Sequence, residues 1–242
     1  MSGNRFAAVA YLILVFGSVS GASRQASAQD VKTQYPSMAP LDQYLVADRN
    51  AEITLARSAA PTSISSDATV LVFEKNGYQT AFEGKNGFTC LVERSWMSPF
   101  DGPEFWNPKM RGPICYNPAA VRTILPYTIN RTKLVLAGLS KAQMRENIVA
   151  ATAKDKLPMP EAGAMSYMMS KEGNLGDSAG HWCPHLMFHV PKTEEENWGA
   201  DLEGSPVLYN NENRDVPEPE TIFMVPVFYW SDGSVASHQA FD

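Results

Sequence analysis

Cysteine and histidine are scarce in this chain of 242 residues, which contains three of the first and four of the second. Basic residues are also outnumbered by acidic ones, 20 against 26, so the net charge is −6 at pH 7. Proteins that neutralise nucleic-acid phosphates need clustered lysine and arginine. Here the basic residues are scattered while acids gather, as in Glu194-Glu195-Glu196. We therefore expect no nucleic-acid partner.

Long hydrophobic runs are missing after the first 28 residues, so no later stretch is expected to span a membrane. The first 28 residues have the three parts of an export signal, with Arg5 in a polar start, an apolar run over residues 6–19, and Ala26-Ser27-Ala28 at the end. Because the run is broken by Gly17 and is shorter than the roughly 20 residues that cross a bilayer, we favour cleavage over a retained anchor. We predict an exported protein, periplasmic or secreted.

Cleavage after residue 28 leaves residues 29–242, a chain long enough for one large core. The leader carries Arg5 and Arg24 and no acid, so its removal leaves 18 basic and 26 acidic residues and a charge of −8. A hydrophobic content of 44% predicts that this chain folds. We expect a single globular domain over residues 29–242, with a short N-terminal linker.

An exported protein meets oxidising conditions, in which three cysteines form at most one intramolecular bridge. We predict that Cys90 pairs with Cys115, which would close the base of the loop between them. The alternative is three buried thiols, with Cys183 acting as a small hydrophobic residue.

Two Asn-Gly pairs ten residues apart, at Asn76-Gly77 and Asn86-Gly87, lie between alternating apolar runs. Asn-Gly in that setting is the strongest short signal for a tight hairpin. We therefore predict a three-stranded antiparallel meander within residues 69–93. The connection that follows, residues 95–117, is rich in proline and aromatic residues, which either line a ligand pocket or cover the sheet.

Helices are predicted over residues 40–59, after Asn117-Pro118, and over residues 141–154 behind the cap Ser140. Residues 127–136 are compatible with helix or strand, and Lys133-Leu134-Val135-Leu136 favours strand. The remainder of the chain reads as strands with turns. Together, the predicted helices and strands indicate an α+β fold with a mainly antiparallel sheet that contains the meander and packs against a few helices.

The densest chemistry lies in residues 176–191. Potential metal donors occupy every second position, at His181, Cys183, His185, Met187 and His189, and apolar residues occupy the positions between them. A strand over residues 185–190 would place those donors on one face. Residues 181 and 189 would then lie roughly 27 Å apart, so only part of the set can share an ion.

The donor types suit zinc or copper. We take His181, Cys183, His185 and His189 as the candidate metal ligands, with His185 and a partner from elsewhere in the fold, such as His238, as the centre of the site. The alternative is that these histidines are ordinary hydrogen-bonded residues.

A second interpretation concerns Gly176-Asp177-Ser178-Ala179-Gly180. This pentapeptide resembles the nucleophile elbow of hormone-sensitive-lipase-type esterases in the α/β-hydrolase fold, which implies Ser178 as a nucleophile, with His238 and Asp201, Asp215 or Asp232 completing a triad. The surrounding sequence lacks the alternating strands and helices of that fold. The pentapeptide also resembles the Gly-Asp-Ser-Gly-Gly of trypsin-like proteases. That family requires a histidine before the serine, and no histidine precedes Ser178.

A third interpretation is a binding or envelope-associated module, with Trp96, Trp106 and Trp198 as contact residues. Our leading hypothesis combines the metal-site and binding-module interpretations. It is an exported binding module for a small ligand or envelope partner, with zinc or copper held by the stretch 181–189. The alternative is an esterase-like serine hydrolase using Ser178. The sequence leaves open whether the protein is an enzyme.

Overall fold

A computed structural model describes residues 34–177, 183–209 and 216–236. The chain divides into two compact units, residues 1–32 and 33–242, and every described residue belongs to the second. The predicted export signal therefore lies outside the described residues. None of the helices within the described ranges is both long enough and apolar enough to cross a membrane.

The fold is α+β, as predicted, and is built on an eight-stranded, mostly antiparallel sheet in the order β2-β1-β3-β4-β5-β6-β8-β7. The strands are β1 Thr69–Glu74, β2 Gly77–Phe82, β3 Thr89–Glu93, β4 Gly112–Tyr116, β5 Met165–Met168, β6 His185–Pro191, β7 Leu208–Tyr209 and β8 Glu220–Pro226. The α-helices are α1 Arg49–Arg57, α2 Thr62–Ser65, α3 Pro118–Thr123, α4 Leu125–Leu136 and α5 Lys141–Thr152. Three 3₁₀ turns, η1 Leu41–Tyr44, η2 Ser95–Met97 and η3 Glu195–Trp198, complete the described elements.

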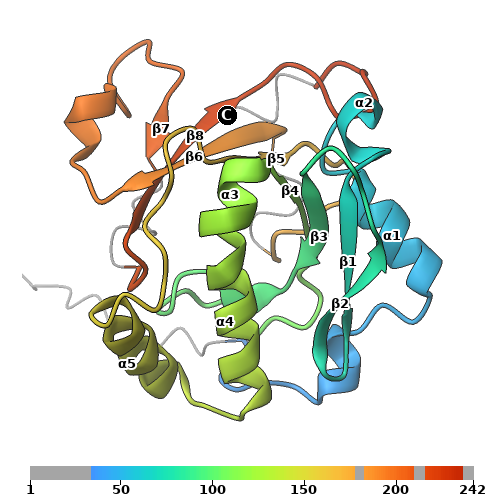
Figure 1. Cartoon of the computed structure of the whole chain (residues 1–242), viewed down its shortest axis with the longest axis vertical. Coiled ribbons are helices and arrows are strands. Elements are labelled where there is room, and N and C mark those ends of the chain that lie inside the picture. The colour runs from blue at the N-terminus through green and yellow to red at the C-terminus, as the bar shows by residue number, and fades with distance from the viewer. Residues whose placement is uncertain (1–33, 178–182, 210–215, 237–242) are drawn as a thin grey trace, which may run out of the picture. The chain divides into compact units, whose positions relative to one another are not determined.

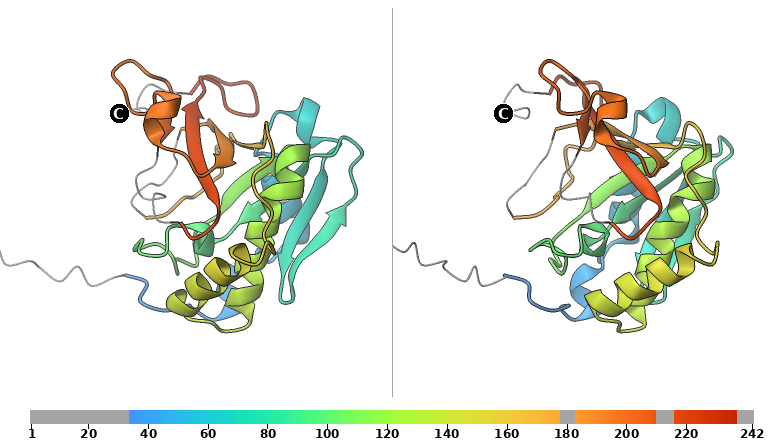
Figure 2. Two further views of the ribbon diagram at one scale, coloured as in Figure 1. Left: turned by 60° about the vertical axis from the view of Figure 1, so that its left-hand side comes forward. Right: turned by 90° about the vertical axis from the view of Figure 1, so that its left-hand side faces the viewer.

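Helices cover both faces of the sheet. Helix α1 packs on β1, β3 and β4, and the small core there contains Ala56, Val70 and Val92. Helices α3 and α4 run one after the other along the opposite face, with α5 beside α4 (Figures 1 and 2). The larger core lies on that face and includes Leu91 and Ile114. The alternation of side chains along each strand separates the two cores.

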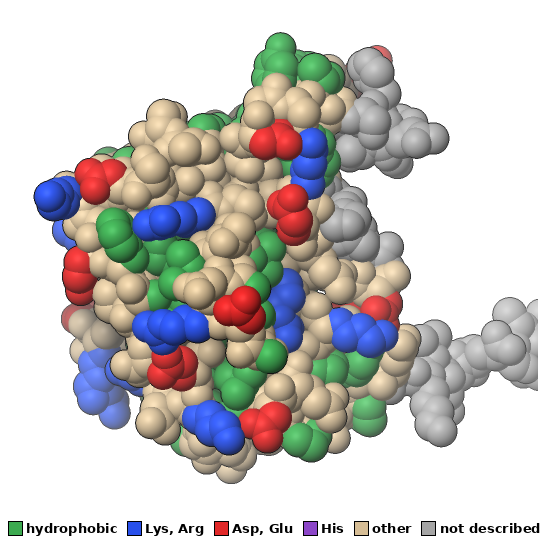
Figure 3. Space-filling model, turned by 90° about the vertical axis from the view of Figure 1, so that its right-hand side faces the viewer, with side chains coloured by type: hydrophobic (Ala, Val, Ile, Leu, Met, Phe, Trp, Pro, Cys, Tyr) green, Lys and Arg blue, Asp and Glu red, His purple; other side chains and the backbone are tan. Residues whose placement is uncertain are grey.

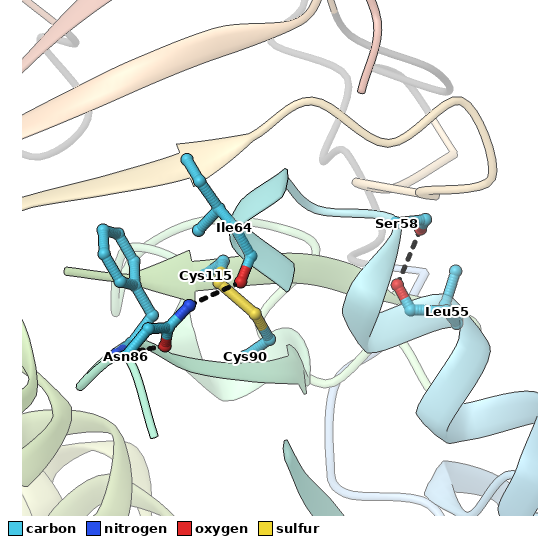
Figure 4. Close-up of a disulfide and its surroundings, with 7 residues drawn as sticks. Leu55, Ser58, Ile64, Asn86, Cys90 and Cys115 are labelled. Atoms are coloured by element: carbon cyan, nitrogen blue, oxygen red, sulfur yellow. Dashed lines mark hydrogen bonds between the residues drawn. A yellow bond between two sulfur atoms is a disulfide. The ribbon is translucent and has the colours of Figure 1, made fainter. Parts of the chain in front are cut away.

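The predicted disulfide is confirmed. Cys90 and Cys115 are directly opposite each other on β3 and β4, and their sulfur atoms are bonded on the face covered by α1 (Figure 4). Near the bridge the Asn86 side-chain amide donates to the carbonyl of Ile64, 2.7 Å away. Cys183 is left as a buried free thiol.

The predicted meander is wrong in its pairing, although its three strands are present. β1 and β2 form the expected hairpin, but β3 lies on the other side of β1 and runs parallel to it. The loop after β2 crosses the start of β1 at Gly84, where a Cβ atom would lie 2.3 Å from the backbone of residues 67–69. Only glycine permits this close crossing, so the second Asn-Gly pair belongs to a crossover and not to a hairpin.

Two predictions of regular structure also need correction. The predicted helix at residues 40–59 is interrupted, because Asp48 is extended and its side chain caps α1 by accepting from the amide of Asn50. Residues 127–136 are helix, with Pro126 in the first turn, where proline is tolerated. The buried side of α4 is mixed, with Thr128, Arg131 and Thr132 beside Tyr127 and Val135. A search for apolar periodicity therefore does not reveal the helix.

The long connection at residues 95–117 also differs from expectation, since it ends in the regular strand β4. Its aromatic residues mainly fill the larger core, as the sheet-covering alternative predicted. The predicted caps are present: Asn117 accepts from the amide of Ala120 at the start of α3, and Ser140 with Gln143 forms a capping box on α5.

Candidate functional site

The strand predicted for the donor stretch is present as β6. His185, Met187 and His189 line a cavity on one face of the sheet, while Phe188, between them, packs toward Trp198. The expected alternation is therefore confirmed for the described part of the stretch. Cys183 lies two residues before the strand and is buried.

The cavity has a volume of about 760 Å³. Its floor is the sheet from β3 to β8, and α4 and the segments 97–104 and 216–218 form its sides. The sheet residues that line it are Glu93, Gly112, Ile114, Tyr116, Met168, His185, Met187, His189, Leu208, Tyr209, Glu220, Ile222 and Met224. Methionine and branched aliphatic side chains make much of this floor, and a few ionisable groups converge among them.

His189 is held by a hydrogen bond at each ring nitrogen. Its Nδ1 lies 2.8 Å from Oε2 of Glu220 on β8, and its Nε2 lies 3.0 Å from the hydroxyl of Ser166 on β5. Because a carboxylate accepts and does not donate, Nδ1 carries a proton, and Nε2 shares its hydrogen bond with the hydroxyl of Ser166. His189 is only 3% exposed, so both bonds lie inside the protein.

Serine, histidine and carboxylate bonded in this sequence have the connectivity of a serine-hydrolase triad. Ser166, however, is 0% exposed, so its hydroxyl is out of reach of a substrate in the cavity. The arrangement instead fixes the ring of His189, with Ser166 and Glu220 as positioning residues.

A second polar group surrounds Glu93 at the end of β3. Oε1 of Glu93 accepts from the hydroxyl of Tyr116, 2.6 Å away, and from that of Thr128 on α4, 3.1 Å away. Burial raises the pKa of Glu93, opposed by these hydrogen bonds and by the nearby His189 and Arg131. Burial, with the Glu93 carboxylate second, raises the pKa of Tyr116 well above its ordinary value, so its phenol stays protonated and donates.

The third group is an ion pair between α4 and the segment before β8. Nε and an Nη atom of Arg131 donate to the two carboxylate oxygens of Glu218 over 2.6 and 2.7 Å. The other Nη atom donates to the carbonyls of residues 96–98. Burial acts to lower the pKa of Arg131, but the charge and hydrogen bonds of Glu218, together with the charges of Glu220 and Glu93, outweigh it and the pKa is raised. This bidentate pair ties α4 to β8 across the cavity.

His185, four residues before His189 on the same face, has its Nδ1 2.8 Å from the carbonyl oxygen of Cys183. A carbonyl only accepts, so Nδ1 carries the proton. Burial lowers the pKa of His185 to about 4, and the ring is therefore neutral at pH 7. Burial also raises the pKa of the Cys183 thiol, which keeps it protonated.

The candidate metal ligands are only partly placed. His181 and His238 lie outside the described residues. Within the described ranges, no three His, Cys, Asp or Glu side chains are grouped so that they could hold a metal ion. Zinc or copper binding by His181, Cys183, His185 and His189 stays a prediction.

The proposed nucleophile Ser178 and two of its expected partners, Asp215 and His238, also fall outside the described residues. Of the described carboxylates, Asp232 bonds Lys171 over 2.8 Å, and the hydrogen bond from this lysine is the main cause of its lowered pKa. The esterase resemblance implies an α/β-hydrolase, whose sheet is mainly parallel, whereas the observed sheet is mostly antiparallel. Hydrolysis by Ser178 stays a prediction without support from the fold.

The tryptophans differ from their predicted role as contact residues. Trp96 is fully buried and Trp106 is 7% exposed, so both belong to the core. Trp198 is 39% exposed and stacks on Phe223, on the face of β8 away from the cavity. Of the three tryptophans predicted as contacts, all of them described, Trp198 alone retains a surface on which a partner can pack.

The sequence analysis missed several cavity residues, chiefly Glu93, Arg131, Glu218 and Glu220, and also Ser166, which positions His189 from below the surface. A weak signal exists for Glu220, an acid at the start of an apolar strand. Comparison of the chain with protein-family models, with curated proteins and with solved structures gave no significant match.

Proposed function

We propose that the protein binds a small organic molecule in the cavity between the sheet and α4. The observation that carries this proposal is a volume of about 760 Å³ that holds three hydrogen-bonded polar groups, those of Glu93, His189 and Arg131, among apolar side chains. Ligand pockets typically have volumes of roughly 300–1,000 Å³ and the same mixture of apolar walls and a few fixed polar groups.

The fixed geometry of the polar groups also supports binding. Each uses hydrogen bonds from neighbouring elements: His189 from β5 and β8, Glu93 from β4 and α4, and Arg131 from the segment before β8. Groups that are already oriented lose little freedom when a ligand arrives. A protein needs no such arrangement merely to fill a core, because apolar side chains would do so at lower desolvation cost.

The face of the molecule shown in Figure 3 gives no comparable support for a polyanionic partner. On the face shown in Figure 3, acidic and basic side chains are interspersed and no broad basic area forms. A nucleic-acid site would need clustered positive charge.

Titration with the uncharged fluorophore Nile red tests the proposal. We expect saturable fluorescence enhancement with the native protein, and its loss in Ile222→Trp, which places a larger side chain in the cavity. Val225→Trp is the matched control, since its position pairs with Leu186 on the opposite face of β8. Equal enhancement in both variants, or none in the native protein, would contradict the proposal.

Transition-metal binding by the stretch 181–189 is a second candidate function, favoured by the state of His185. Metal-bound histidines usually donate their other ring N–H to a backbone carbonyl or carboxylate, as Nδ1 of His185 does to Cys183. The lowered pKa keeps this ring in the neutral form that ligates metals.

A further inference from the structure

The charges on the cavity walls are unbalanced. Among the described residues that line it are five carboxylates and two guanidinium groups. The carboxylates belong to Glu93, Glu104, Asp201, Glu218 and Glu220, and the guanidinium groups to Arg94 and Arg131. A ligand that enters therefore meets more negative than positive groups.

Both arginines are already neutralised by partners. Arg131 forms its bidentate pair with Glu218, and Arg94 donates to Oε1 of Glu52 over 2.8 Å while it is fully buried. Breaking either buried pair to receive an anionic ligand would leave a buried charge without its partner, which is costly. The arginines are consequently poor sites for a carboxylate or phosphate ligand.

Within the described ranges, none of the other four carboxylates pairs with a lysine or an arginine, and Glu104 accepts from the side-chain amide of Asn107. Glu93 accepts only from the hydroxyls of Tyr116 and Thr128 among the described residues. Glu220 contacts His189, and Asp201 accepts from the backbone amide of Tyr209. Glu93 and Glu220 come from β3 and β8, so two elements supply negative charge to the same space.

We propose that the ligand is an organic cation, an ammonium group attached to an apolar body. This inference rests on the proposed small-molecule function and assigns the chemical class of the ligand. An ammonium group donates hydrogen bonds to carboxylates such as those of Glu93 and Glu220. The apolar body packs against Met168, Met187 and Met224, whose flexible side chains adapt to varied shapes.

A bare metal ion fits these carboxylates less well than an organic cation. No three acidic, histidine or cysteine side chains within the described ranges are grouped closely enough to share an ion. A cavity of about 760 Å³ also greatly exceeds the space of a single ion. The aromatic rings of Tyr116 and Tyr209 add surfaces that favour a bulky cation.

Displacement of Nile red by three molecules of one shape tests the inference. These are 4-phenylbutylamine, 4-phenylbutanol and 4-phenylbutanoate, which are cationic, neutral and anionic at pH 7. We expect the amine to displace the fluorophore at about one tenth of the concentration that the alcohol requires, and the carboxylate to be the weakest. Glu93→Gln, which keeps the size of the side chain and an acceptor oxygen, is expected to reduce the preference for the amine about tenfold. Binding of the uncharged alcohol should weaken much less than that of the amine in that variant.

The outcomes separate this inference from the proposed function. If Nile red binds the native protein and not Ile222→Trp, while the amine displaces it no better than the alcohol or carboxylate, the cavity function stands and the cation inference is overturned. An amine preference unaffected by Glu93→Gln also overturns it, because the charge on the floor would then play no part. If Nile red fails to bind the native protein, the proposed function fails and this inference fails with it.

Discussion

His189 and Glu220, from the neighbouring strands β6 and β8, are joined by a 2.8 Å hydrogen bond inside the wall of the cavity. They are 3% and 7% exposed, so water competes little for either side chain. We expect Glu220→Ala to lower the free energy of unfolding by about 2–3 kcal/mol, because the Nδ1–H of His189 loses its buried acceptor. Urea denaturation followed by circular dichroism measures this change.

Glu161→Ala serves as the control for that variant. Glu161 also has a charged partner, Arg122, at 2.8 Å, but both side chains are exposed. Solvent-exposed pairs contribute little to stability, so this variant should unfold at the same urea concentration as the native protein. Equal losses in the two variants would show that burial of the His189–Glu220 pair does not strengthen it.

The disulfide offers a second prediction. Cys90 and Cys115 are 25 residues apart, and closing such a loop stabilises a protein by about 3.5 kcal/mol in the loop-entropy model. The double variant Cys90→Ser and Cys115→Ser is expected to lose stability of that order in urea denaturation. Cys183→Ser, which removes a buried thiol and keeps the bridge, should lose stability with reductant as the native protein does, whereas the double variant should respond equally in its presence and absence. A native protein whose stability is unaffected by reductant under unfolding conditions would contradict the bridge's role.

The raised pKa of Glu93 predicts that the stability of the protein depends on pH. Burial raises its pKa in the folded protein, so between the ordinary value of 4.5 and the folded value the native state binds more protons than the unfolded state. Its contribution to the free energy of unfolding is therefore fully present below pH 4.5 and is lost as the pH rises through the folded pKa. Groups facing it are Tyr116 on β4, Thr128 and Arg131 on α4, and His189 on β6.

Glu93→Gln isolates this contribution, since glutamine does not titrate and retains an acceptor for Tyr116 and Thr128. The difference in unfolding free energy between the variant and the native protein should grow in favour of the variant as the pH rises above 4.5. Urea denaturation at a series of pH values measures it. A difference that is constant with pH, or that changes in the opposite direction, would show that the pKa of Glu93 is not raised.

The metal hypothesis gives a prediction that is independent of the cavity ligand. Protein purified without chelator is expected to contain about one zinc or copper ion per chain, with the content reduced in Cys183→Ser and in His185→Gln. Elemental analysis measures this content. His189→Gln is expected to retain the metal, because four residues of strand separate positions 185 and 189 by roughly 13 Å. Metal-free native protein that is not stabilised by added zinc or copper would end the hypothesis.

The parts of this fold that local chemistry determines were predictable from the sequence. The alternation of donor and apolar residues at positions 185–190 identified β6 and its cavity face, and Ser140 with Gln143 identified the start of α5. Both signals depend only on side chains a few residues apart. The disulfide was predictable for a different reason, since three cysteines leave few pairings.

The remaining features depend on contacts between distant residues. The pairing of β3 beside β1 follows from the crossing at Gly84, which the Asn-Gly pattern does not indicate. Arg131 and Glu218 are 87 residues apart, and neither has a neighbour in sequence that marks it as a buried partner. The buried side of α4 carries Thr128, Arg131 and Thr132, whose partners Glu93, Glu218 and Trp96 are distant in sequence, so a search for apolar periodicity overlooks it.

A crystal structure of the protein soaked with 4-phenylbutylamine is the most direct test of small-molecule binding in the cavity. We predict electron density for one molecule between β6 and α4, with its ammonium group within hydrogen-bonding distance of the Glu93 or Glu220 carboxylate and its ring against Met187 or Met224. An empty cavity at a concentration that displaces Nile red, with the molecule bound elsewhere, would contradict the proposed function.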